Sequence, residues 1–168
     1  PWTPIERVEA ILKNSGAGIL HDGGDRAYYS PSSDSIHLPP RSSFGSEKGY
    51  YGTALHELGH WTGHANRLNR DLSGGFGCEN YAREELRAEI GSFFLAIETG
   101  IPHDPGQHAS YVDSWVSALK KDPHEIFRAS RDAGRIADYV MAFDLVRRAE
   151  REAERSCPVV PEEKDPPA

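Results

Sequence analysis

One pentapeptide constrains the fold of this chain more than any other feature. Residues 56–60 read His-Glu-Leu-Gly-His, an H-E-x-x-H pattern, and they lie in an apolar run that includes Ala54 and Leu55. Residues four apart share one face of a helix, so His56 and His60 can direct two imidazoles at one Zn²⁺. The segment is therefore predicted to be a buried helix that carries a zinc site on one face.

Glu57 is the candidate catalytic residue of this motif. It follows His56 directly and is displaced around the helix, where its carboxylate can reach a water on the metal. It can take a proton from that water and pass it to a leaving amine. A bound zinc lowers the pKa of the water to about 7 and polarises a substrate carbonyl. The pattern thus predicts peptide hydrolysis with one zinc ion.

A catalytic zinc normally has three protein ligands and one position open to water. The candidates for the third ligand are His64, Glu84, Glu85 and Glu89. His64 lies eight residues after His56, which is about 12 Å further along a helix axis at ~1.5 Å per residue. We therefore expect His64 to be a polar neighbour of the site or part of the loop that follows.

The three glutamates lie on a second predicted helix, over residues 81–99. Its acids resemble the E-x-x-x-acid pattern of glutamate zincins, in which the first acid binds zinc and the second bonds the first histidine of the motif. Glu85 and Glu89 match that pattern. Glu85 is accordingly assigned to the zinc, and Glu89 to orienting an imidazole. Glu89 as the ligand is the main alternative, and Glu84 is expected to be an exposed helix charge.

Hydrophobic periodicity and turn residues predict an α+β chain with a small antiparallel or mixed sheet packed with several helices. Strands are expected near 17–20, 27–29 and 35–38, and helices over 5–14, 46–60, 81–99, 110–121 and 124–154. Gly134 is expected to break or kink the last helix. Ala88 and Ser92 are the small residues expected where the second long helix crosses the first. Phe93, Ile97 and Phe127 are expected inside.

Composition limits the other functions. A chain of 168 residues has the length of one domain. Its net charge of −7 disfavours sequence-independent DNA binding, which depends on Lys and Arg. No apolar run approaches the ~18–20 residues of a membrane span, and two cysteines, Cys78 and Cys157, fit a reducing, cytoplasmic setting. We expect one zincin-like domain over 1–155 and a Pro-rich, disordered tail over 156–168.

Some segments and side chains have two interpretations. The strand at 35–38 is either an edge that pairs with an extended substrate or an ordinary sheet strand. Cys78 is expected to be a surface thiol, with adventitious metal binding as the alternative. Tyrosines that could donate to an oxyanion, although core packing is favoured for each, are Tyr28, Tyr29, Tyr50, Tyr51 and Tyr111. Histidines expected to be solvated are His21, His103, His108 and His124.

Longer stretches resemble one known family. They are Ala-Tyr-Tyr-Ser-Pro at 27–31, Asp-Ser-Ile-His-Leu-Pro at 34–39, the run 50–64 around the motif, and Tyr-Ala-Arg-Glu-Glu-Leu-Arg-Ala-Glu-Ile-Gly at 81–91. Together they resemble the zincin-like metallopeptidase domain of ArdC-type antirestriction proteins, relatives of which occur in polyvalent proteins of plasmids and phages. The resemblance implies a zincin fold akin to SprT-like (Spartan-type) proteases. It also implies cytoplasmic action on DNA-associated proteins while mobile DNA enters a cell.

The same resemblance sets the expected partners. ArdC-type proteins carry a single-strand DNA-binding domain before the peptidase, and this chain starts at Pro1 without an initiator Met. We therefore expect a protein or peptide substrate, no membrane, and single-stranded DNA only through a missing neighbouring domain. The alternative function is a catalytically silent zinc module that protects incoming DNA by engaging restriction or DNA-bound proteins. A DNA mimic is disfavoured, because the acids are dispersed among arginines.

Overall fold

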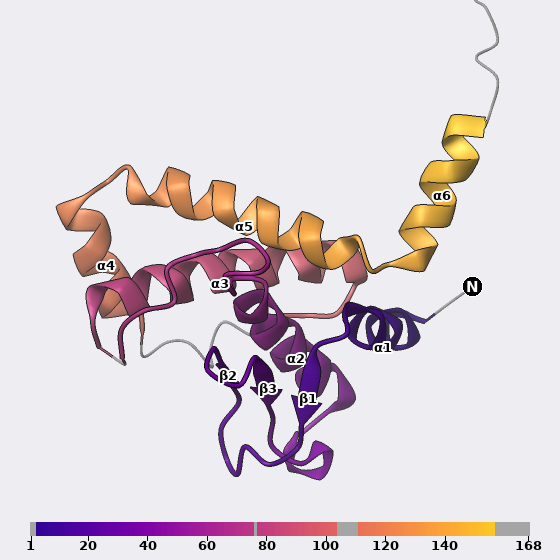
Figure 1. Ribbon diagram of the computed structural model, residues 1–168, viewed down its shortest axis with the longest axis horizontal. Coiled ribbons are helices and arrows are strands. Elements are labelled where there is room, and N and C mark those ends of the chain that lie inside the picture. Colours follow the sequence, from indigo (N-terminus) through magenta and orange to yellow (C-terminus); the bar gives the residue numbers. More distant parts are fainter. Residues whose placement is uncertain (1–2, 76, 104–110, 157–168) are drawn as a thin grey trace, which may run out of the picture.

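The computed structural model describes residues 3–75, 77–103 and 111–156, and this part of the chain is α+β (Figure 1). Its helices are α1 (Pro4–Ser15), α2 (Glu47–Trp61), α3 (Glu79–Thr99), α4 (Val112–Lys121), α5 (Glu125–Met141) and α6 (Leu145–Ser156), with a 3₁₀ turn, η1 (Arg41–Ser43). Its strands are β1 (Gly18–Leu20), β2 (Tyr28–Ser30) and β3 (Ser35–His37). The predicted fold class is confirmed. Among the described helices, none combines the length and apolarity needed to cross a bilayer.

The three strands form one mixed sheet in the order β1-β3-β2. β1 runs parallel to β3 with Ile19 opposite Ile36, and β2 runs antiparallel to β3 with Tyr29 opposite the same residue. Both edges of β3 are therefore paired. The interpretation of residues 35–38 as a substrate-pairing edge is wrong, because a central strand has no free backbone groups to offer. Within the described sheet, β2 is an edge strand instead.

The core lies where α1, β3 and α2 meet the ends of α3 and α5. α1 starts at a capping box, in which Thr3 Oγ1 accepts from Glu6 N at 3.3 Å and the Glu6 carboxylate accepts from Thr3 N at 2.9 Å. Val8, Ile11 and Leu12, which share one face of α1, are buried in this core. Side chains with almost no exposed surface in this core include Val8, Ile11, Ile36, Leu38, Leu58, Leu95, Ile101 and Val140.

Helix α3 is packed on one side by α2 and along its length by α5 (Figure 1). Its buried residues include Glu84, Ala88, Gly91 and Leu95, which recur with the helical period. A Cβ at Gly91 would lie 3.2 Å from Cγ2 of Ile136, so glycine permits the close approach of α5. Ala88 and Ser92 are buried at the crossing with α2, as predicted.

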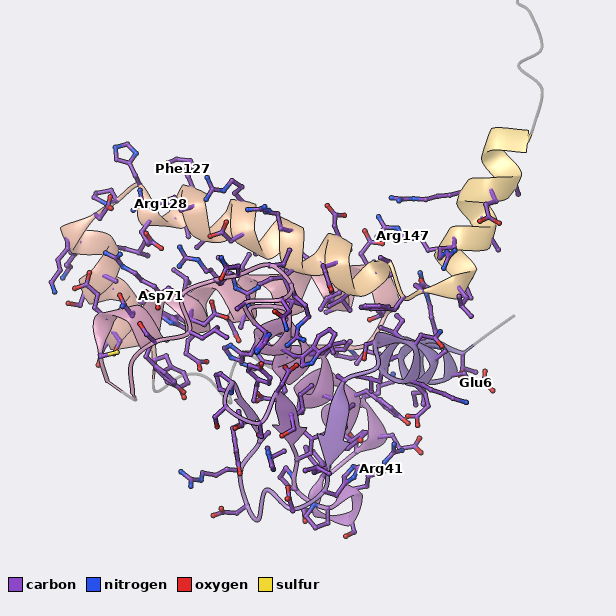
Figure 2. The ribbon with its side chains drawn as sticks, viewed as in Figure 1. Glu6, Arg41, Asp71, Phe127, Arg128 and Arg147 are labelled. Carbon is purple, nitrogen blue, oxygen red and sulfur yellow. The ribbon has the colours of Figure 1, made fainter. Side chains whose placement is uncertain are left out.

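The apolar face predicted for α3 is partly wrong. Phe93 is 56% exposed and Ile97 is 68% exposed. The reason is that α2 and α5 approach the face of small residues, which leaves the bulkier face turned outward. The same error affects α5, where Phe127 is 72% exposed and points away from the body of the protein (Figure 2).

The helix predicted over 124–154 is two helices, and Gly134 does not break it. Gly134 continues α5, and the chain turns at residues 142–144 instead. Asp144 is buried and accepts from Arg7 Nε at 2.8 Å, while its other oxygen accepts from Val146 N at 3.0 Å and so caps α6. α6 then leaves the body of the protein (Figure 1). Apart from Ser156, the predicted tail lies outside the described residues, as do Cys157 and His108.

Candidate metal centre

Helix α2 places the two histidines of the motif side by side. Ser46 caps the helix by accepting from Gly49 N at 3.0 Å, and the helix continues unbroken through Trp61. His56 is 3% exposed, and its Nε2 lies 3.2 Å from Nε2 of His60. The one-face geometry expected from the spacing is therefore present, with two ring nitrogens converging on one point.

Glu85 of α3 brings a carboxylate to the same point. Its Oε2 lies 3.6 Å from His56 Nε2 and its Oε1 lies 3.5 Å from His60 Nε2. One ligand atom from each of the three residues falls within 4.8 Å of the others. Glu89 lies on the opposite side of the His56 ring, where its Oε2 is 3.7 Å from Nδ1. His64 lies in the turn after α2, and its Nδ1 accepts from the backbone two residues on.

The outer nitrogens of both imidazoles face hydrogen-bonding partners. His60 Nδ1 lies 3.2 Å from Glu84 Oε1, and His56 Nδ1 lies 3.2 Å from Ser92 Oγ and close to the Glu89 carboxylate. A carboxylate only accepts, so these neighbours favour a ring proton on Nδ1, and in a neutral ring the lone pair then lies on Nε2. Two lone pairs and a carboxylate therefore meet in a buried space, which is an arrangement that favours a cation.

Burial and neighbouring charges shift the pKa values of His56, His60 and Glu85. Burial lowers the pKa of His56. Burial also opposes protonation of His60, but Glu85 and Glu84 together raise the pKa of His60 well above its usual range. Burial alone would raise the pKa of Glu85, and the two histidines outweigh it and hold that pKa far below its usual range. The site is thus electrostatically suited to hold positive charge against Glu85.

Glu84 is buried, so its prediction as an exposed charge is wrong. It is 7% exposed and accepts from Arg70 Nη2 at 2.7 Å and Arg70 Nε at 3.0 Å, in addition to its contact with His60. Burial raises its pKa, but the bonds from His60 and Arg70 outweigh this and keep the pKa low. Its place in the buried stripe with Ala88 and Gly91 is the signal that could have revealed it.

His103 is also buried, although it was expected to be solvated. Its side chain is 8% exposed, and its Nε2 lies 2.8 Å from Glu89 Oε1. Its ring stacks parallel to that of His56, with 6.4 Å between the centroids. His103 thus holds the carboxylate that faces His56. It lies in the segment after α3, where no periodicity marks it, so only the tertiary fold brings it to the site.

A pocket of about 430 Å³ opens onto the centre. Glu57 lines it and is 6% exposed. The hydroxyls of Tyr81 and Tyr111 lie 3.1 Å apart in its wall, and burial raises the pKa of both phenols. Tyr81 was not singled out from the sequence, although it lies four residues before Glu85 and so shares its helix face.

The other tyrosines, the cysteine and the histidines considered in the sequence analysis lie in different environments. Tyr28 and Tyr29 of β2 line the pocket, whereas Tyr50 and Tyr51 are buried in the hydrophobic core, as favoured for tyrosines. Cys78 is half-buried and caps α3, because its Sγ accepts from the backbone of α3 at 3.4 Å. The two histidines that are exposed as predicted are His21 and His124.

Comparison with known families gives a match over most of the chain. The sequence profile described as zincin-like metallopeptidase matches residues 6–132. A protein named DNA primase TraC from Escherichia coli is 62% identical over 143 residues, which are 85% of this chain and 10% of that protein. An uncharacterized protein of Sinorhizobium fredii, y4eC, is 40% identical over 139 residues, which cover 82% of this chain and 45% of that one.

Solved structures of an antirestriction protein share the fold. The Mn(II)-bound crystal structure of ArdC from the R388 plasmid superposes with a TM-score of 0.76 at 42% identity, covering 82% of this chain and 52% of that one. Its metal-free structure gives a TM-score of 0.74 at the same identity. The chain therefore spans about half the length of the ArdC structure and a tenth of TraC.

Proposed function

The chain belongs to the zincin-like metallopeptidase family, and on that premise we propose that it is a zinc-dependent peptidase domain of an ArdC-like antirestriction protein. It hydrolyses peptide bonds of DNA-associated proteins in the cytoplasm while mobile DNA enters. The observation that carries the proposal is the convergence of His56, His60 and Glu85 on one point in a pocket that Glu57 also lines.

The donor set fits one divalent cation. Two imidazole nitrogens bound to a tetrahedral zinc at about 2.0–2.1 Å lie about 3.3 Å apart, and the two Nε2 atoms here are 3.2 Å apart. Two nitrogen donors and one carboxylate are also the ligand set of catalytic zinc in many hydrolases. His56, His60 and Glu85 would hold the ion. A related ArdC structure, 42% identical, is described as Mn(II)-bound, which supports binding of a divalent metal.

When bound, the ion supplies Lewis acidity, which polarises the scissile carbonyl and makes water nucleophilic near neutral pH. Glu57 accepts the proton of the attacking water and passes it to the leaving nitrogen, as a general base and then a general acid. Glu84 and Glu89 keep His60 and His56 oriented, and His103 holds Glu89.

The walls of the pocket fit an extended peptide. β2 lines it and is an edge strand, so its outer backbone groups can pair with a substrate strand. Tyr81 and Tyr111 place two phenol hydroxyls in the wall near Glu85. Burial raises the pKa of each phenol, so both stay protonated and can donate to the oxygen that becomes negative in the transition state.

The test separates metal binding from chemistry. Glu57→Gln is expected to retain stoichiometric zinc and lose peptide cleavage, because the amide cannot accept the proton. Glu85→Ala is expected to lose zinc by metal analysis; stoichiometric zinc in that variant would move the ligand to Glu89 or His64. Glu47→Gln, in the first turn of the same helix, is the matched control and should change neither quantity.

The alternative is a zinc-containing module that protects DNA by binding proteins without turnover. Its distinguishing readout is protection of incoming DNA from restriction in cells, with the domain carried in its full-length protein. Loss of protection in Glu57→Gln supports the peptidase. Full protection by that variant, together with intact zinc, would replace hydrolysis by binding as the function.

A further inference from the structure

A second pocket lies behind the metal centre, on the far side of Glu84. Its volume is about 320 Å³, and Glu84 lines both pockets. The loop after α2, helix α3 and helix α5 contribute its walls, and α3 and α5 run side by side along it (Figure 1). Its lining includes five arginines, Arg70, Arg83, Arg87, Arg131 and Arg135.

The lining is positive, although the chain as a whole is acidic. The lining also includes three carboxylates, those of Asp71, Glu84 and Asp132. The lining residues alone therefore have a formal charge of +2. The chain has a net charge of −7. On α3 and on α5 the arginines are spaced four residues apart, so like charges are stacked on one face of each helix, which repels them.

Two of the carboxylates are engaged by three of the arginines. Glu84 accepts from Arg70 and contacts His60. Asp132 accepts from Arg87 Nε at 2.9 Å and from Arg131 Nη2 at 3.1 Å. Arg87 is further neutralised by Glu125, at 2.7 Å. These ion pairs leave Arg83 and Arg135 without a carboxylate partner from the pocket lining.

Arg83 lies on α3 and Arg135 lies on the neighbouring helix α5. Arg83 donates through Nη2 to Glu79 at 2.7 Å, but its Nε is buried and has no hydrogen-bond partner among the described residues. A buried donor of this kind normally has a partner. Arg135 is exposed and has neither an ion pair nor a side-chain hydrogen bond within the described part of the chain.

We propose that this pocket binds a phosphate group, with Arg83 and Arg135 as its principal ligands. A guanidinium presents planar, paired donors that match phosphate oxygens. Guanidinium groups from two neighbouring helices offer donors to the oxygens of one phosphate group, whether of a monoester or of a nucleic-acid strand. The polar, arginine-rich lining excludes an apolar ligand, and the buried Nε of Arg83 gains an acceptor. The proposal does not depend on peptidase activity.

The test is a titration of the metal-free protein with inorganic phosphate at constant ionic strength, followed by backbone amide NMR. Saturable shifts are expected around the pocket. Arg83→Gln and Arg135→Gln should each weaken binding by about tenfold, since each removes a charge-assisted hydrogen bond. The matched control is Arg148→Gln, which removes an exposed arginine of α6 outside the pocket and should leave the affinity within about twofold.

A second arm identifies the source of the phosphate. A short single-stranded oligothymidylate that displaces inorganic phosphate from the same amides indicates a nucleic-acid phosphodiester, whereas phosphate binding without displacement indicates a free phosphate or a monoester. Absence of saturable shifts, or equal weakening by all three substitutions, would overturn the proposal. Thermal unfolding of each variant checks that the fold is retained.

Discussion

Replacing Glu84 by alanine tests both stability and metal binding, because this one buried carboxylate contacts a histidine of the metal centre and a buried arginine. Its Oε1 receives both His60 Nδ1 at 3.2 Å and Arg70 Nη2 at 2.7 Å, and its Oε2 receives Arg70 Nε at 3.0 Å. The substitution therefore leaves a buried guanidinium without its counter-charge and an imidazole without its orienting acceptor.

The size of the expected loss of stability follows from the burial of the Glu84–Arg70 ion pair. The side chains of Glu84 and Arg70 are each 8% exposed, and breaking a buried pair by removing one partner costs about 3–5 kcal/mol. Arg70 keeps its bonds to Thr62 Oγ1 and the Gly59 carbonyl, both at 2.8 Å, so the low end applies. We expect about 3 kcal/mol, or a fall of about 6–12 °C in Tm for a domain of this size. Loss of the orienting carboxylate should weaken metal binding about 10–100-fold.

The assay is denaturant unfolding of the metal-free protein, combined with a zinc titration against a competing chelator. The control is Glu79→Ala, which removes an exposed, ion-paired glutamate of the same helix. It should leave the free energy of unfolding and the zinc affinity nearly unchanged. The double substitution Glu84→Leu with Arg70→Met replaces the pair by apolar groups. It should recover most of the stability while zinc affinity stays low. An alanine variant that unfolds within about 1 kcal/mol of the parent would refute the reasoning.

Three further perturbations test the fold. Gly23→Ala should destabilise the turn before β2, since a Cβ there would lie 2.3 Å from the carbonyl oxygen of Arg26; equal Tm values would contradict this. Hydrogen bonds from Arg67 lower the pKa of Asp34, so this carboxylate stabilises the fold above its unfolded pKa of about 4 and less as the pH falls through its folded value. The stability gap between the parent and Asp34→Asn should therefore shrink from pH 7 to pH 3, and a constant gap would argue against the ion pair. Phe127→Ser should change the free energy of unfolding by no more than about 0.5 kcal/mol, because the ring is exposed; a larger loss would place it in a core.

Local patterns in the sequence were sufficient for the three strands, for most of the helices and for the pair of histidines in the site. The caps at Thr3 and Ser46 determine where α1 and α2 begin, because a side-chain oxygen satisfies free amides at that position only. The four-residue spacing of His56 and His60 determines that both rings share a face. The acid pattern at Glu85 predicted which carboxylate lies beside them. The caps and the histidine spacing depend on contacts within one helical turn or on the period of one helix, whereas the assignment of Glu85 depends on the resemblance to glutamate zincins.

The errors arose where a residue's environment comes from another element. Glu84 was expected outside, and Phe93 was expected inside, because the apolar periodicity of α3 does not say which face α2 and α5 will approach. His103 lies outside any periodic segment, so its place against Glu89 depends on the path of the chain after α3. Asp144, at the break between α5 and α6, accepts from Arg7, which lies near the other end of the chain.

The sequence by itself thus determined where α1 and α2 begin and that two imidazoles share one face of α2, because those follow from backbone geometry within a single element. Only the tertiary structure decided that Glu84 contacts His60 and His103 contacts Glu89, that β3 is central and β2 is an edge, and that five arginines meet behind Glu84. The physical reason is that helices pack where small residues permit close approach, as at Gly91, and that approach then buries whichever charged side chains lie on the same face.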